Sequence, residues 1–376
     1  MNRFKTAAVS GFLACTLAAG MLAGCGKADG TAAAVTVNNE TLNMGAAEFY
    51  LRSSQAQTTS AMISYGMAQA GGEFWDMDMS ATSDSEASTY GDNMKETSQE
   101  SLVNDLVLRQ HAADYNVTIP EDMQAELDKD AEALYEANID VLEKFGTTED
   151  DVKTIMELQS YQTLMLDPMT ADTDLTVTDE EAAQSTISYV RAALSSYDSS
   201  TYQTTELTDD EKTQRMNELT QVLAEVNAAS DPAAADLSTI ASGIDADNLY
   251  ASTASYGADD SVLPTEVTDA AATLKDGEVY GEVIVTDSFY YVIRMDATFD
   301  REATDAKKES LANTKKNDAY QEILQGWVDA SDVKWSSAWN KLEVTDKDGY
   351  SAKAAETAAD STEAASTSVV SGSSAE

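Results

Sequence analysis

Few residues in this sequence could carry out catalytic chemistry. The chain has one histidine, His111, and two cysteines, Cys15 and Cys25. It contains no H-E-x-x-H zinc motif, no phosphate loop of the G-x-x-x-x-G-K type, no G-x-G-x-x-G motif and no EF-hand loop. Its 67 acidic residues are spread along the chain, so no pair stands out as a general acid and base. We therefore expect no metal and no cofactor, and the apolar and phenolic side chains become the candidates.

The most informative stretch of the sequence is residues 263–295. Four apolar residues at helical spacing predict a short helix with one apolar face: Val267, Ala270, Ala271 and Leu274. Gly277 follows, and predicts a left-handed stop to that helix. Residues 279–285 alternate as in a half-buried strand, and residues 289–295 predict a second strand. The predicted unit is helix, glycine stop, strand, turn and strand.

This order resembles the end of a parvulin-type peptidyl-prolyl isomerase domain. The family pattern is roughly M-x-x-P-F-x-x-A-x-x-L-x-x-G-E-x-S-x-P-V, followed by a turn and G-Y-H-I-I-K. The matching residues here are Leu263, Pro264, Val267, Ala270, Leu274, Gly277, Glu278, Val283, Tyr291, Val292, Ile293 and Arg294. The most important departure from the family is the missing histidine.

The resemblance implies an apolar pocket for a proline ring and a hydrogen-bonded cluster around the peptide carbonyl. It places the pocket at Leu263 and Val267, and the two family histidines at Tyr189 and at Tyr290 or Tyr291. An ungapped count ends at Tyr290, whereas matching the preceding turn and the Val-Ile-Arg ending gives Tyr291, which we prefer. Tyrosine donates a hydrogen bond but does not titrate near neutral pH as histidine does. The same five residues are expected to contact the client, with isomerase activity weak or lost.

The segment before this stretch carries weaker family features. Thr178 and Thr208 each begin a T-x-x-E capping box and predict helix starts. Residues 187–192 predict a strand similar to the family's A-R-H-I-L-V, and residues 195–207 predict a polar loop. The family's G-G-D-L-G has no counterpart at residues 254–259.

The N-terminal half resembles the chaperone region of SurA-like and PrsA-like foldases. Residues 34–42 predict a hairpin around Asn-Asn, and Asn43 is a candidate N-cap for the next helix. Further helices are predicted at residues 97–115, 120–145 and 148–168, where the last begins with Thr148 and Asp151 in a near capping box. The turns Tyr-Asn-Val-Thr-Ile-Pro-Glu-Asp-Met and Phe-Gly-Thr-Thr-Glu-Asp-Asp-Val carry the resemblance.

Two other features of this half have competing interpretations. Phe74 and Trp75 could contact unfolded clients, but packing against their own domain is the favoured interpretation. His111 is predicted to be a surface or packing residue, because it is distant in sequence from the parvulin-like stretch.

The chain begins with features of an exported lipoprotein. Arg3 and Lys5 precede an apolar, alanine-rich run that is too short for a permanent membrane span. Residues 22–25, Leu-Ala-Gly-Cys, resemble a lipobox whose Cys25 is lipidated; a plain secretory signal is the alternative. The formal net charge of −44 makes nucleic acid an unsuitable partner.

The predicted fold class is α+β: a mainly helical SurA N-terminal-like chaperone domain with an inserted parvulin-like (FKBP-like) α/β domain. The predicted segments are a signal peptide (1–24), a tether (25–33), the chaperone region (34–178), the parvulin-like domain (179–300), a C-terminal helix that returns to the chaperone region (301–344) and a disordered tail (345–376).

The predicted function is that of a membrane-anchored, extracytoplasmic foldase or chaperone. Its expected partners are unfolded or nascent secreted proteins and, through the lipid, the cell membrane; the resemblance also allows for a homodimer. The alternative is a solute-binding lipoprotein of a transporter, but such proteins show alternating β-α-β units in two lobes. A wall-spanning structural lipoprotein is a third option, suggested by the polar tail.

Overall fold

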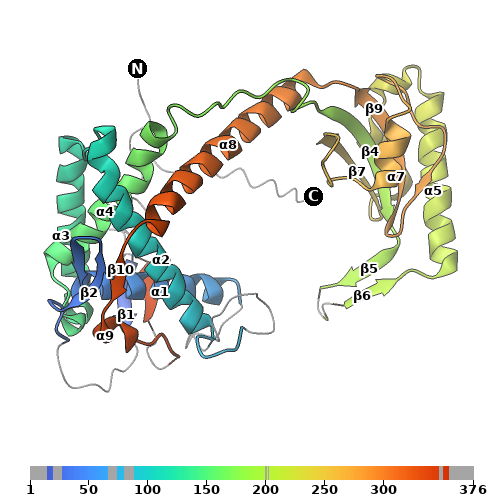
Figure 1. Ribbon diagram of the computed structural model, residues 1–376. Coiled ribbons are helices and arrows are strands. Elements are labelled where there is room, and N and C mark those ends of the chain that lie inside the picture. The colour runs from blue at the N-terminus through green and yellow to red at the C-terminus, as the bar shows by residue number, and fades with distance from the viewer. Residues whose placement is uncertain are drawn as a thin grey trace. The chain divides into compact units, whose positions relative to one another are not determined.

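The computed structural model describes residues 15–19, 28–66, 74–79, 89–199, 201, 203–346 and 350–354. The chain divides into two compact units (Figure 1). We call Met1–Asp172 with Ala319–Glu376 the helical unit, and Thr173–Asp318 the sheet unit. Both combine helices with antiparallel strands, which confirms the α+β class. No helix in the described ranges is both long enough and apolar enough to cross a bilayer.

The helical unit opens with the predicted hairpin. Strands β2 (Ala33–Val37) and β3 (Glu40–Asn43) pair across a turn in which Asn38 has φ of 56°. Asparagine tolerates this left-handed conformation better than most residues. The Asn43 side chain then accepts a hydrogen bond from the Ala46 N–H at 2.8 Å, which starts the next helix as predicted.

The helices that form the body of this unit are α1 (Met44–Ser64), α2 (Tyr90–His111), α3 (Glu121–Phe145) and α4 (Glu149–Met169), with a short 3-10 turn at Ala112–Tyr115. The Thr148–Asp151 capping box of α4 is present, as predicted. The predicted start near residue 97 is wrong for α2, because Thr89 caps the helix by accepting a hydrogen bond from the Asp92 N–H.

The core of the helical unit is rich in large side chains. Phe74 and Trp75 are both buried in it, which confirms the packing interpretation of this pair. The largest side chains that are almost completely buried there are Trp75, Trp339, Phe49, Leu51, Leu102, Leu106, Leu108, Leu127, Leu142, Ile155 and Leu158.

The C-terminal segment returns to the helical unit. Helix α8 (Arg301–Asp329) contributes Tyr320 and Leu324 to the core. Strand β10 (Val333–Trp335) pairs with β2, and the short helix α9 (Ser337–Asn340) buries Trp339. The sheet unit is therefore inserted into one continuous helical unit.

A second pair of strands joins the two ends of the chain. β1 (Cys15–Ala19) and β11 (Tyr350–Ala354) are antiparallel, with Cys15 opposite Ala354. The sequence predicted no structure at residues 345–376, and β11 corrects this for five of them. Backbone pairing explains the difference, because it satisfies N–H and C=O groups whatever the side chains are.

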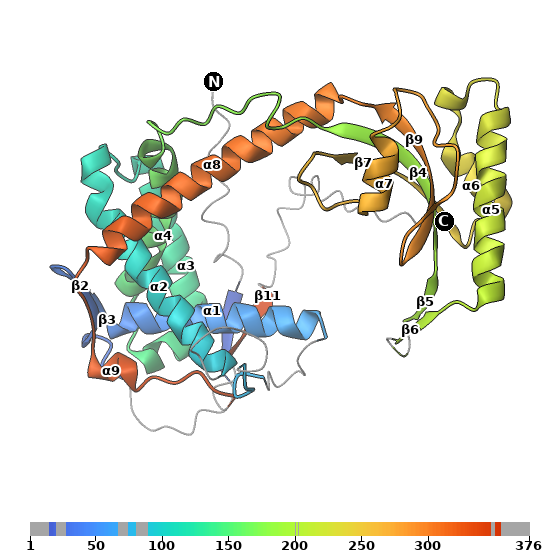
Figure 2. The same ribbon diagram turned by 45° about the vertical axis from the view of Figure 1, so that its right-hand side comes forward.

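The sheet unit is built on four antiparallel strands in the order β7-β4-β9-β8. Helices α5 and α6 cover one face and α7 covers the other (Figure 2). Its elements are β4 (Ser185–Ala193), β5 (Ser195–Asp198), β6 (Gln203–Glu206), α5 (Asp209–Ala228), a 3-10 turn (Pro232–Ala234), α6 (Leu237–Asp245), β7 (Leu249–Tyr256), α7 (Thr265–Ala271), β8 (Ile284–Val285) and β9 (Phe289–Ala297).

Several local predictions in the sheet unit need correction. Residues 195–207 form the hairpin β5–β6 rather than a loop, because their backbones pair although their side chains are polar. Residues 279–283 are not a regular strand, and β8 has two residues. Gly277 does have φ of +81°, but it lies in a turn after α7 has already ended at Ala271. The Thr178 box forms a single turn instead of a helix.

Candidate functional site

Two tyrosines lie together on one face of the sheet. Side chains alternate along β4 and β9, so Tyr189 and Tyr291 share the face that α7 covers. The strand register pairs Tyr291 with Arg191, two residues from Tyr189 along β4, so the tyrosines are diagonal neighbours. Their ring centroids are 5.7 Å apart and their planes are inclined at 61°, an edge-to-face contact that aromatic rings favour. The two positions predicted to replace the family histidines are therefore in contact.

Val267 on α7 and Leu263, two residues before that helix, complete the same cluster. Pro264 immediately precedes the helix, where its missing N–H costs no hydrogen bond. Its carbonyl accepts a hydrogen bond from the Val267 N–H at 3.0 Å, which turns Val267 toward the sheet. Leu263 and Val267 are both buried among the side chains around Tyr291.

Tyr290 is the one predicted site residue that the fold separates from the others. It follows the strand alternation onto the opposite face of β9, where it packs against the cluster that includes Val190 of β4 and Leu219 of α5. Tyr291 therefore shares a face of the sheet with Tyr189, and Tyr290 lies on the other face.

The tyrosine cluster is packed rather than open. Tyr189 is 9% exposed and Tyr291 is 3% exposed, and both belong to the core between the sheet and α7. A phenol can donate one hydrogen bond, but it cannot exchange protons near neutral pH as an imidazole does. In the described ranges, no three His, Cys, Asp or Glu side chains converge as they would around a metal ion. The cluster supports binding contacts and offers no acid–base pair.

An ordered series of side chains leads from this cluster to solvent. The Arg191 guanidinium lies 4.6 Å from the centroid of the Phe289 ring and 5.1 Å from that of Tyr250. Phe289 in turn contacts Tyr291, with ring centroids 6.0 Å apart. We call Tyr250, Arg191, Phe289, Tyr291 and Tyr189 the aromatic row. Its outer end is accessible, because Tyr250 is 55% exposed whereas the inner tyrosines are buried.

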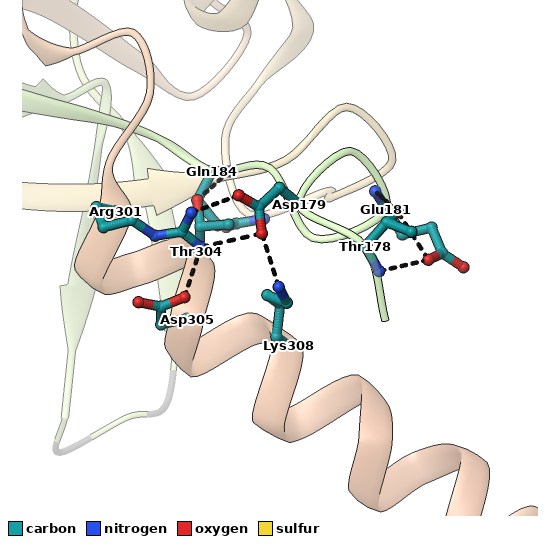
Figure 3. A network of polar contacts seen from close by, with 8 residues as sticks. All are labelled: Thr178, Asp179, Glu181, Gln184, Arg301, Thr304, Asp305 and Lys308. Carbon is teal, nitrogen blue, oxygen red and sulfur yellow. Dashed lines mark hydrogen bonds and ion pairs between the residues drawn. The ribbon is translucent and has the colours of Figure 1, made fainter. Parts of the chain in front are cut away.

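A polar network holds the two ends of the sheet unit together (Figure 3). Asp179, on the entering segment, accepts hydrogen bonds from Arg301 at 2.5 Å and Lys308 at 2.6 Å, both on α8. These bonds, that from Arg301 foremost, lower the pKa of Asp179 to about 2. The Gln184 N–H also donates to the buried Thr304 hydroxyl at 3.1 Å. The network connects the segment just before β4 to the first two turns of α8.

The remaining predicted residues lie elsewhere. His111 stacks on Trp327 in the helical unit, with ring centroids 4.1 Å apart, and its Nδ1 is 2.8 Å from an Asp114 carboxylate oxygen. This is the predicted surface and packing role. Cys25 lies outside the described residues, so its predicted lipidation stays a prediction.

Sequence reasoning missed a buried carboxylate in the helical unit. Asp105 is 1% exposed and accepts a hydrogen bond from Gln162 at 2.6 Å, while its second oxygen is buried with no hydrogen-bond partner among the described residues. Burial raises the pKa of Asp105 to about 6. The signal was available, because Asp105 follows Leu102 by three residues on the apolar face of its helix.

Comparisons with known proteins give a limited picture. No protein-family model matches the sequence, and no curated protein matches it. The foldase protein PrsA from Streptococcus pneumoniae is similar in structure at a TM-score of 0.29 and 16% identity, covering 63% of this chain and 84% of that one. PrsA peptidyl-prolyl isomerases from Bacillus anthracis (TM-score 0.24, 15% identity, 61% and 94% covered) and Bacillus cereus (0.25, 15%, 71% and 95%) are also similar. At these TM-scores the function has to be argued from the geometry of the chain itself.

Proposed function

We propose that this protein is an extracytoplasmic foldase that holds unfolded exported polypeptides and has little or no prolyl isomerase activity. The sheet unit has four antiparallel strands with helices on both faces, which supports the expected parvulin-like α/β domain. Its clients would be unfolded or nascent secreted proteins.

The contact between Tyr189 and Tyr291 carries this proposal. The resemblance predicted that these two residues, far apart in sequence, would meet where the family has two histidines. They do meet, on the face that also holds Leu263 and Val267. Because both rings are packed in the core, a proline ring could enter this place only by displacing them. The same observation therefore supports the ancestry of the site and the loss of its catalysis.

Client binding is assigned to the outer end of the aromatic row. Tyr250 exposes more than half of its surface and is continuous with the buried tyrosines through Arg191 and Phe289. Aromatic rings bind apolar segments with large contact area and little loss of side-chain freedom. The buried pair Phe74 and Trp75 of the helical unit offers no such surface.

The membrane anchor belongs to the same proposal. Lipoprotein processing would lipidate Cys25 and hydrolyse the peptide bond before it, which would remove residues 1–24 and, with them, strand β1. Strand β11 would then lose the partner with which it pairs in the full chain. Labelled fatty acid should be incorporated by the wild-type protein and lost in Cys25→Ser; equal labelling of both would contradict the anchor.

The solute-binding alternative receives no support from the fold. Every strand pair in the described ranges is antiparallel, whereas alternating β-α-β units build parallel sheets.

Two assays on the full chain test the two halves of the proposal. A proline-containing tetrapeptide should isomerise at its spontaneous rate when the protein is added at catalytic concentration. A reduced, unfolded secreted protein should aggregate less when the protein is added at equal concentration. Clear acceleration of isomerisation would overturn the loss of catalysis, and unchanged aggregation would overturn client binding.

A further inference from the structure

Arg191 is unusual among the arginines of the sheet unit. Arg215 pairs with Glu218 and Asp245, Arg294 with Asp296, and Arg301 with Asp179 and Asp305. Among the described residues, no carboxylate lies within ion-pair distance of Arg191. The chain carries 67 acidic residues against 23 lysines and arginines, so an arginine without an acidic partner is unexpected.

Among the described residues, Arg191 makes no hydrogen bond through its guanidinium. Its guanidinium lies over the rings of Phe289 and Tyr250, which are on the strands to either side of β4. Cation–π attraction to a ring does not require the N–H bonds of a guanidinium, which lie in its plane. A planar fork of donors between two aromatic rings is suited to a carboxylate, which it can bind through two parallel hydrogen bonds.

The position of Arg191 ties it to the client site. It lies two residues after Tyr189 on the same face of β4, a distance of about 7 Å along a strand. An extended client whose apolar side chains contact the aromatic row would therefore have another side chain within reach of Arg191. The large net negative charge of the protein repels acidic runs, so a single acidic residue between apolar ones is the best match.

We propose that Arg191, held between Tyr250 and Phe289, binds the side-chain carboxylate of an aspartate or glutamate that lies within an apolar segment of an unfolded client. This rests on the client-binding function proposed above and names the kind of segment that is preferred. The aromatic rings bind the apolar neighbours, and the guanidinium selects the acid.

The test uses two fluorescent, C-terminally amidated peptides that differ by one residue. Each has a central glutamate or glutamine flanked by leucine and phenylalanine, and binding to the full chain is followed by fluorescence anisotropy. The wild-type protein should bind the glutamate peptide about tenfold more tightly, which corresponds to about 1.4 kcal/mol. Amidation ensures that the preference comes from the side chain and not from the peptide terminus.

Matched variants assign the preference to Arg191. Arg191→Gln should bind both peptides equally, at the wild-type affinity for the glutamine peptide. Lys275→Gln removes the same charge from an exposed position of the same unit and should keep the tenfold preference. Tyr250→Ala, at an exposed position, should reduce the preference two- to threefold without affecting the fold.

The outcomes separate the two proposals. Equal affinity of the wild-type protein for both peptides, or a preference that persists in Arg191→Gln, overturns the carboxylate site and leaves client binding intact. Failure of the wild-type protein to bind either peptide overturns client binding itself, and the carboxylate site with it.

Discussion

The helical and sheet units differ in how far their large apolar side chains are exposed. In the helical unit Phe49, Trp75 and Trp339 are almost completely buried. Among the described residues, eight large apolar side chains are strongly exposed, and five belong to the smaller sheet unit: Tyr197, Tyr250, Val262, Val285 and Phe299. Scattered exposed residues are common, but Tyr250 is the end of a continuous row. Under the proposed function, the helical unit would serve as a scaffold and the sheet unit would carry the client-binding surface.

The two units also contain carboxylates whose pKa values are shifted in opposite directions. Asp105 of the helical unit is buried without a cation, which raises its pKa to about 6. Asp179 of the sheet unit is exposed and bound by Arg301 and Lys308, which lower its pKa to about 2. The stability of each unit should therefore respond to acid with a different sign.

The largest expected effect comes from a substitution that lowers the stability of the sheet unit alone. Leu219→Ala removes a fully buried side chain from the inner face of α5 and should destabilise the sheet unit by about 2–5 kcal/mol. All four tryptophans, Trp75, Trp327, Trp335 and Trp339, belong to the helical unit. Urea unfolding followed by circular dichroism should therefore gain an early transition that tryptophan fluorescence does not show.

Tyr250→Ala is the matched control for this substitution, because its side chain is exposed and its loss should change stability by less than about 0.5 kcal/mol. If the fluorescence midpoint falls together with the circular dichroism midpoint in Leu219→Ala, the units unfold as one and the comparison fails.

An intermediate effect concerns the buried carboxylate. The native state keeps a proton on Asp105 up to about pH 6, whereas the unfolded state releases it near pH 3.8. The helical unit should thus lose about 3 kcal/mol of stability as pH rises from 4 to 6 and above. Asp105→Asn keeps an acceptor for Gln162 and removes this loss, although burying an unpaired amide N–H offsets part of the gain.

The measurement is the urea midpoint of tryptophan fluorescence at pH 4.5 and pH 7.5. Asp105→Asn should be more stable than the wild type at pH 7.5, by about 1 kcal/mol, with a smaller difference between the two pH values. A variant that keeps the full wild-type pH dependence would contradict the assignment.

The smallest effect lies in the polar network of the sheet unit. Asp179 has a pKa below its ordinary value. Its charged form therefore stabilises the folded state above pH 4, and this contribution is lost as pH falls toward 2. The urea midpoint of the sheet-unit transition, followed by circular dichroism, should therefore fall less on acidification in Asp179→Asn than in the wild type. Because the carboxylate is exposed, solvent screening keeps the difference small. Identical acid sensitivity of both proteins would show that the network contributes nothing.

Local signals in the sequence predicted much of the framework. Capping residues such as Asn43, Thr148 and Thr208 fix helix starts through bonds to residues three positions away, so they are readable from sequence. Strand alternation likewise predicts that the neighbours Tyr290 and Tyr291 lie on opposite faces of the sheet, as they do.

Features that depend on distant partners could not be predicted in the same way. The aromatic row requires the register of β7 and β9 against β4, which brings Tyr250 and Phe289 to Arg191 from 59 and 98 residues away. The hairpin β5–β6 is stabilised by backbone pairing of polar residues, so its side chains carry no apolar pattern. The charge state of Asp105 depends on burial by several helices.

A photo-crosslinking amino acid placed at one exposed tyrosine of each unit tests the central claim most directly. Tyr250 of the sheet unit is 55% exposed, and Tyr65 of the helical unit is 80% exposed. With an unfolded secreted protein as client, we predict strong crosslinking from position 250 and little from position 65. Crosslinking from position 65 with none from position 250 would show that clients bind the helical unit, and would contradict the account.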